Sequence, residues 1–126
     1  MDRRYQHFDR RMEREHPNTW SNVHQDCRHA IFNYLVHGYN PGGFLTAVMT
    51  NDLYRAAATA DIENSKRLTR VANFVTQALP SCCYGSHAAM EAWRERTDQE
   101  RELLLIDRAL LPTLFEVIQN PDGELT

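Results

Sequence analysis

The sequence predicts an all-α fold, a compact bundle of five to six helices in one domain, and three observations support this prediction. Apolar residues recur at i, i+3, i+4 and i+7, a spacing that places them on one face of a helix. Hydrophobic residues make up 42% of the 126 residues and charged residues 25%, as in an ordinary globular domain. The chain has no alternating strand pattern of useful length and no internal repeat.

Residues 1–16 are dense in charge and fit either a weak amphipathic helix or a disordered arm. Only Tyr5, Phe8 and Met12 recur there at helical spacing. Pro17 interrupts the pattern, so the main helical domain is placed at residues 17–119. Residues 120–126 are expected to form a frayed tail.

The segment 22–37 has the clearest helical pattern in the chain. Its apolar residues follow one helix face from Val23 to Leu35. Gly38 suits the left-handed conformation that ends many helices. Three side chains can accept a free N–H group at the start of this helix, namely Thr19, Ser21 and Asn22.

The run Asn40-Pro41-Gly42-Gly43 has the chemistry of a tight turn. A short helix is expected from Phe44, and Asn51 or Asp52 then caps a second helix that continues to Ala60. We predict that the turn and the cap are structural features and that this helix pair lies near the centre of the bundle.

Three further helices are predicted in the second half of the chain. Asp61 is the expected cap of a helix that ends at Pro80, and Ser86 caps the next helix. Thr97 and Glu100 form a capping-box pattern, which fits either a separate helix or one continuous with its predecessor.

Composition and charge exclude several classes of protein. No apolar run approaches the roughly 20 residues of a membrane-spanning helix, and the charged N-terminus lacks a signal-peptide pattern. The odd number of cysteines, Cys27, Cys82 and Cys83, argues against a disulfide framework. Acids outnumber bases by 17 to 14, which argues against direct nucleic-acid binding. We therefore expect a cytoplasmic protein.

The cysteines and histidines allow two kinds of chemical site. Neither C-x-x-C nor H-E-x-x-H occurs, so no metal or cofactor is predicted despite the presence of His24, Cys27, His29, Cys82, Cys83 and His87. Cys82 or Cys83, which precede the helix capped by Ser86, could serve a small Cys-dependent enzyme with His87 nearby. Free cysteine is more often a small core residue, so this enzyme is an alternative only.

A second alternative is a protein that sequesters a small ligand such as a signalling nucleotide. The glycine turn is followed by neither a Walker lysine nor a G-x-G-x-x-G motif. Ligand phosphates would instead contact basic side chains on the middle helices, Arg55, Lys66, Arg67 and Arg70. These bases fit a solvated helix face equally well.

The end of the chain carries more apolar residues than one core-facing stripe uses. A near-heptad seam interrupted by Pro112 runs through Leu103, Ile106, Leu110, Leu114 and Val117. Three leucines fall beside it, Leu104, Leu105 and Leu111, with a charged rim of Glu100, Glu102, Asp107 and Glu116. We expect these residues to form an interface, either in a homodimer near its two-fold axis or with a partner. A central core helix is the alternative.

Residues 23–96 carry a resemblance to a known group of proteins. The motif P-G-G-F-L-x-A-V-x-x-N-D-L from Pro41, followed by Ala60-Asp61, the run Cys82-Cys83-Tyr84-Gly85-Ser86 and Trp93, resembles small helical proteins encoded by bacteriophages and prophages. By analogy, the resemblance implies a non-enzymatic protein that binds and inhibits a host protein or complex in the bacterial cytoplasm. An antiviral-defence complex is one such target, which makes the expected function similar to that of an anti-CRISPR protein. From Glu95 onward, eight acids and three bases suit a basic groove on the target.

Overall fold

The computed structural model describes residues 3–59 and 62–112, with the backbone alone at Leu53, Thr59 and residues 62–67. Every regular element in this part is helical, which confirms the all-α class. Its eight α-helices exceed the predicted five to six, because residues 3–15 are helical and a one-turn helix follows Pro17. They are α1 (Arg3–Glu15), α2 (Pro17–Trp20), α3 (Gln25–His37), α4 (Gly43–Met49), α5 (Leu53–Thr59), α6 (Ile62–Ala78), α7 (His87–Glu95) and α8 (Asp98–Asp107), with a 3-10 turn η1 (Ser81–Cys83) before α7.

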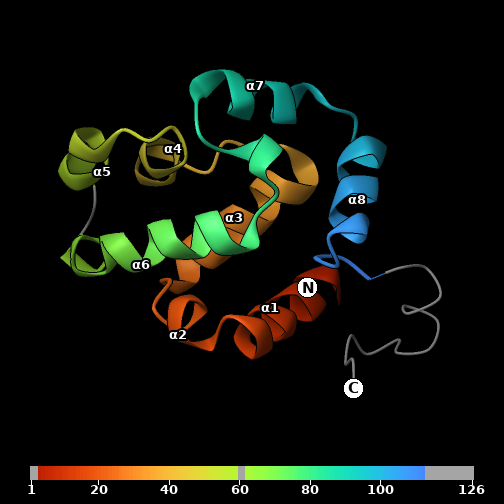
Figure 1. The fold of residues 1–126 in the computed structure, drawn as a ribbon, viewed down its shortest axis with the longest axis horizontal. Coiled ribbons are helices and arrows are strands. Elements are labelled where there is room, and N and C mark those ends of the chain that lie inside the picture. Colours follow the sequence, from red (N-terminus) through yellow and green to blue (C-terminus); the bar gives the residue numbers. More distant parts are fainter. Residues whose placement is uncertain (1–2, 60–61, 113–126) are drawn as a thin grey trace.

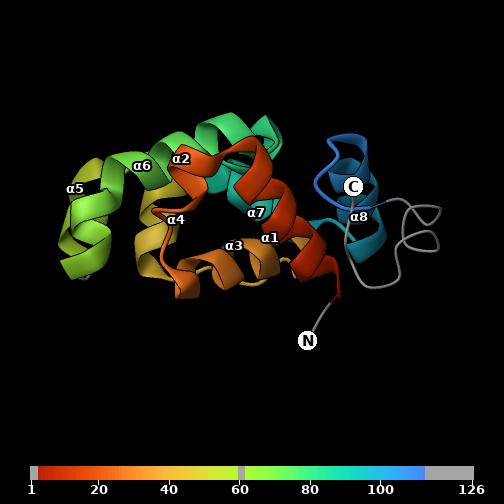
Figure 2. The same cartoon turned by 90° about the horizontal axis from the view of Figure 1, so that it is seen from below.

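The helices α3 and α6 run through the middle of the molecule, and the other helices surround them (Figure 1). At one end α4 packs against α5 and α6, and at the other end α8 packs against α3. The view turned by 90° shows the same arrangement, with α5 and α8 at opposite ends (Figure 2). The helix pair α4 and α5 therefore occupies one end of the bundle rather than its centre.

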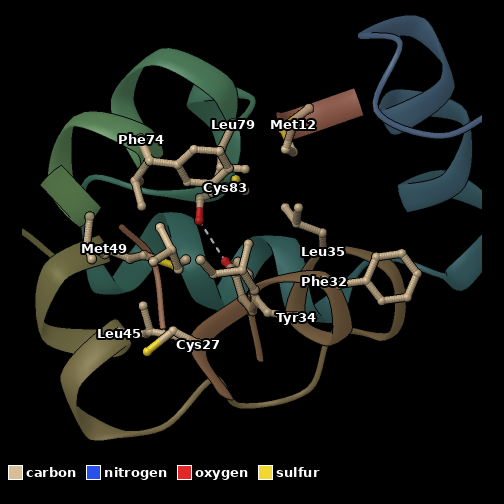
Figure 3. Packing of buried hydrophobic residues seen from close by; sticks show 14 of the residues in the cluster. Met12, Cys27, Phe32, Tyr34, Leu35, Leu45, Met49, Phe74, Leu79 and Cys83 are labelled. Carbon is tan, nitrogen blue, oxygen red and sulfur yellow. Dashed lines mark hydrogen bonds between the residues drawn. The ribbon is translucent and has the colours of Figure 1, made fainter. Parts of the chain in front are cut away.

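One hydrophobic core joins residues from all parts of the described chain (Figure 3). Trp20, Tyr34, Phe74 and Trp93 are completely buried. The hydroxyl of Tyr34 donates a hydrogen bond of 2.6 Å to the carbonyl oxygen of Cys83, which connects α3 to the loop before α7. A buried hydroxyl needs such a partner, because leaving it unpaired away from water costs free energy.

The helix α1 belongs to this core and is not a separate arm. Tyr5, Phe8 and Met12 lie on one face of α1 and are buried. The ring of Phe8 meets the ring of Trp20 edge to face, with centroids 5.5 Å apart. The helical alternative for the start of the chain is therefore confirmed, and the apolar stripe of α1 packs on the same core as the rest of the described chain.

The start of α3 differs from the prediction, whereas its end agrees. The ring Nδ1 of His24 accepts the N–H of Asp26 at 3.3 Å, so His24 is the cap in place of Thr19, Ser21 or Asn22. Thr19 lies inside the extra turn α2, and the side chain of Asn22 donates back to the Asn18 carbonyl. Gly38 ends α3 in the left-handed conformation, with φ of 71°.

The junction between α4 and α5 is built by two adjacent residues. Asn51 is left-handed, with φ of 65°, and its N–H donates to the Val48 carbonyl while that of Asp52 donates to the Ala47 carbonyl. This pair of hydrogen bonds is a Schellman end for α4. Asp52 Oδ1 then accepts the N–H of Arg55 at 3.0 Å and caps α5. The structural role predicted for this cap is confirmed.

The later caps also form as predicted. Ser86 Oγ accepts the N–H of Ala89 at 3.0 Å, and Thr97 Oγ1 accepts the N–H of Glu100 at 3.1 Å. The cap at Thr97 shows that α8 is a separate helix and not a continuation of α7. Asp61 and the tail 120–126 lie outside the described residues. None of the described helices has the length and apolar character needed to cross a membrane.

Candidate functional site

The helix α8 is held on the core by Arg101 and Leu105, which lie one turn apart and are 3% and 1% exposed. Arg101 Nε donates to the carbonyl of Val36 at 3.1 Å, and Nη1 donates to the carbonyls of Trp93, Arg94 and Arg96. Its Nη2 donates to the carboxylate of Asp98. The guanidinium thus sits at the negative carboxyl ends of both α3 and α7, where a cation is favoured.

The carboxyl end of α3 receives further donors from α7. Trp93 Nε1 lies 3.3 Å from the Tyr34 carbonyl and 3.2 Å from that of Leu35, and Arg94 Nε donates to the Gly38 carbonyl at 3.0 Å. The last carbonyls of a helix have no partner within it, so these side chains supply what α3 lacks. A Cβ on Gly38 would lie 3.0 Å from Cζ of Arg101, which makes this position doubly suited to glycine.

The end of α8 overturns the predicted near-heptad seam. Ala109 is left-handed, with φ of 61°, and the N–H of Leu110 donates to the Leu105 carbonyl at 2.8 Å. The helix therefore stops at Asp107, and the chain turns back before Pro112. Leu103, which the seam places inside, is 60% exposed, because it lies on the opposite side of α8 from Arg101 and Leu105.

The predicted interface is corrected by these positions. Leu105 and Leu111 are 1% and 4% exposed and pack into the core of the same chain, so neither is left bare for a partner. Glu102 is half-buried, and its Oε1 forms a 2.7 Å salt bridge to Arg4 Nη1 on α1. Three residues of the predicted seam and rim lie outside the described residues, namely Leu114, Glu116 and Val117.

Four residues of the predicted seam and interface lie on the side of α8 opposite Arg101 and Leu105. We call them the α8 face: Glu100, Leu103, Leu104 and Asp107. Leu103 is one of three large apolar side chains that are strongly exposed in the described part of the chain. Leu104 is half-buried, whereas Glu100 and Asp107 are exposed. Neither carboxylate forms a salt bridge with a described residue. The face therefore has an apolar centre between two negative charges.

The structure argues against a catalytic role for Cys83. This side chain is fully buried, and burial raises the pKa of its thiol to about 12. Since the thiolate is the nucleophile, Cys83 is unreactive near neutral pH. Cys82 and His87 are exposed, whereas Cys27 is buried. Within residues 3–59 and 62–112, no three or more His, Cys, Asp or Glu side chains gather as metal ligands.

Of the four bases predicted to bind an anion, the two whose side chains are described do not lie together. Arg70 Nη1 donates to Asn22 Oδ1 at 2.7 Å, on the side of α6 that meets α2. Arg55 is exposed on α5, at the end of the molecule. The side chains of Lys66 and Arg67 lie outside the described part, so that part of the prediction is untested.

Two adjoining cavities lie between the α4–α5 junction and α6. Their volumes are about 220 and 200 Å³, and both are lined by Val48, Asn51 and Ala72. We call them together the α4–α6 groove. A third cavity of about 270 Å³ lies between residues 40–46 and α7. Sequence reasoning did not find these hollows.

The sequence matches no protein family, and no curated protein or solved structure is significantly similar to it. The resemblance of residues 23–96 to phage-encoded proteins therefore stays a prediction.

Sequence reasoning missed Arg101 altogether, although one signal was present. Position 101 lies four residues before Leu105 and therefore shares its helix face. An arginine on the apolar side of a short helix needs several acceptors, because a buried charge is costly unless it is paired. Those acceptors come mostly from backbone carbonyls, which leave no trace in the residue types.

Proposed function

We propose that this chain is a non-enzymatic protein that binds a host macromolecule through the α8 face and thereby inhibits it. The observation that carries the proposal is the 60% exposure of Leu103 between the carboxylates of Glu100 and Asp107, neither of which is paired with a described base. An apolar centre with a charged rim is the usual anatomy of a protein interface.

The rigid attachment of α8 supports this use. Arg101 joins α8 to the ends of α3 and α7, so the α8 face is held in one orientation before any partner arrives. A preformed surface loses less conformational freedom on binding than a flexible one, and this improves affinity. The exposed leucine would enter an apolar recess on the partner while the carboxylates meet its basic groups.

The charge of the α8 face favours a different protein over a second copy of this chain. In a symmetric dimer built on this face, Glu100 and Asp107 would approach the same residues of the other subunit. Like charges brought together are unfavourable, so the predicted homodimer has less support than a basic partner. A nucleic-acid-binding groove on a host defence complex is a target of the required charge.

The proposed interaction is tested with tagged protein and lysate of a bacterial host. The triple variant Glu100→Gln, Leu103→Ser, Asp107→Asn should lose a partner that the unmodified chain retains, because it loses the apolar centre and both charges. Glu91→Gln on α7 is the matched control, since it removes one exposed carboxylate elsewhere. Captured proteins are identified by mass spectrometry, and the affinity of the purified pair is then measured at two salt concentrations.

Two results would contradict this proposal. One is equal retention of the partner by the triple variant and the control. The other is an affinity that does not fall with salt, because a complex steered by exposed charges is weakened by screening.

The alternative of a Cys-dependent enzyme is tested separately by thiol labelling. We expect a disulfide reagent to modify one of the three cysteines rapidly in the native protein, namely Cys82, and all three after denaturation. Rapid native labelling of Cys83 would restore this residue as a candidate nucleophile, whereas the same role for Cys82 stays an alternative.

A further inference from the structure

The α4–α6 groove lies at the end of the molecule opposite α8 and has an apolar floor. Val48 and Ala72 line both of its cavities, and Ala47, Ala56 and Leu68 line the larger one. The small side chains leave the hollow open between the helices. Its larger cavity, about 220 Å³, exceeds the roughly 150 Å³ that admits a benzene-sized molecule in an apolar protein interior.

The polar groups that line the larger cavity come from both of its walls. Asn51 and Asp52 belong to the α4–α5 junction, and Thr69 and Asn73 belong to α6. The amides of Asn51 and Asn73 form no side-chain hydrogen bond with a described residue. Each amide therefore keeps both donors and its acceptor available to a ligand.

Asp52 is the one charged residue among the described residues that line this cavity. Its Oδ1 accepts the N–H of Arg55, so Oδ2 is available to a further donor. Asp52 forms no salt bridge within the described part of the chain, and its side chain is half-buried. A ligand that covered this carboxylate without pairing it would remove it from water, which is costly.

From this arrangement we propose that the α4–α6 groove binds an aliphatic ammonium group on an alkyl stem. The stem lies on the floor formed by Val48, Leu68 and Ala72, and the ammonium group donates to Asp52 and to the amide oxygens of Asn51 and Asn73. An ammonium group has three donors and no acceptor, so it suits a cavity whose two walls carry three acceptor side chains. A free alkylamine and the side chain of a lysine both carry this chemistry.

The experiment is an NMR titration of the whole chain labelled with ¹⁵N, using three five-carbon probes that differ in the charge of their head group. The probes are n-pentylamine, which is cationic at pH 7, 1-pentanol, which is neutral, and pentanoate, which is anionic. We expect pentylamine to shift the amide signals of Val48, Asn51 and Ala72, with an affinity at least about tenfold higher than that of pentanol, as expected for one charge-assisted hydrogen bond. Pentanoate should leave these signals unchanged.

The variant Asp52→Asn separates the proposed site from the stability of the fold. Asparagine caps a helix as well as aspartate does, so α5 should keep its start while the charge is lost. We expect pentylamine to bind this variant no better than pentanol does. The variant Ala72→Met should fill the groove and weaken both probes, and Ala57→Met, an exposed position on α5, is its matched control.

A fourth probe separates the two sources of the ligand. N-acetyl-lysine methylamide carries the same stem on a peptide unit, so binding equal to that of pentylamine points to a lysine side chain, and binding of pentylamine alone points to a free amine. The proposal is overturned by the absence of shifts in the groove, by equal binding of pentanol or pentanoate, or by unchanged pentylamine affinity in Asp52→Asn. These outcomes are independent of the α8 face, whose partner is tested by other variants.

Discussion

The two ends of this molecule are built in contrasting ways. At the α8 end, Arg101 is almost completely buried and donates to carbonyls from α3 and α7, and Trp93 and Arg94 complete the same carboxyl end of α3. At the α5 end, Ala56 is the one described side chain of α5 that is buried, and Tyr54 is 88% exposed. One end is closed by many directed hydrogen bonds, whereas small side chains leave the other open.

This difference indicates where stability and ligand binding reside. The closed end presents the α8 face on a rigid support, which suits contact with a macromolecular partner. The open end contains the α4–α6 groove, which suits a ligand that inserts between helices. Substitutions at the closed end should therefore have much larger effects on stability than substitutions at the open end.

The largest effect is expected for Arg101→Met. Methionine keeps much of the length and apolar stem but leaves the buried carbonyl of Val36 without its side-chain donor and removes the hydrogen bonds of Arg101 to the end of α7. We expect a loss on the order of 3 kcal/mol in the free energy of unfolding, measured by urea denaturation. Arg108→Met, at an exposed position just beyond α8, should change stability by less than about 0.5 kcal/mol. Similar effects of the two variants would show that the buried hydrogen bonds of Arg101 do not stabilise the α8 end.

The next largest effect is expected for Gly38→Ala. Alanine would be strained at φ of 71°, and its Cβ would press on the guanidinium of Arg101. We expect a loss of about 2 kcal/mol in the free energy of unfolding, measured by urea denaturation. In the Arg101→Met background, where the guanidinium is absent, the same substitution should cost only about 1 kcal/mol, from the backbone strain alone. If the loss is equal in the two backgrounds, contact with Arg101 has no energetic weight.

A smaller effect is expected at the open end, for Asp52→Ala. The change removes the acceptor of the Arg55 N–H and should cost about 1 kcal/mol. Asp52→Asn should restore most of this loss, as measured by thermal unfolding of both variants. A loss as large as that of Arg101→Met would show that the α5 end is as closely built as the α8 end.

The smallest effect has the opposite sign and concerns Ala109→Gly. Ala109 is left-handed, with φ of 61°, a conformation that is unfavourable for alanine and open to glycine. We expect a gain of roughly 0.5 to 1 kcal/mol in unfolding free energy. Ala88→Gly, at an exposed position within α7, should instead be destabilising. If both variants lose stability, Ala109 is not left-handed and α8 does not end at this position.

The sequence predicted those features that depend on a few adjacent residues. Asn51 or Asp52, Ser86 and Thr97 were predicted as caps from their residue types ahead of a helical pattern, and Asp52, Ser86 and Thr97 each accept an N–H three residues further on. The start of α3 is an exception, because His24 caps it. Gly38 was identified as a helix end because its conformation is a local property. The helical class followed from the apolar spacing, which likewise needs no knowledge of distant contacts.

The features that the sequence did not predict depend on distant or backbone partners. Arg101 pairs mainly with carbonyls, and Ala109 has no side-chain signal for a left-handed end. Because the end of α8 at Ala109 was not predicted, the leucines of α8 were assigned to the wrong sides of the helix. Leu103 was placed in the buried seam but is exposed, and Leu105 was placed at an interface but is buried. The α4–α6 groove was not predicted for a related reason. It is the space left where small side chains of three helices meet, and this meeting depends on distant contacts.

The closed end also has a consequence for the order in which the chain acquires its structure. The hydrogen-bond partners of α3 lie far along the chain, at separations of 49 residues for Tyr34 and Cys83, 59 for Trp93 and Tyr34, and 65 for Arg101 and Val36. Contacts of such separation form slowly, because a long loop has to close first. During synthesis, the carbonyl of Val36 therefore cannot receive its side-chain donor until residue 101 has left the ribosome.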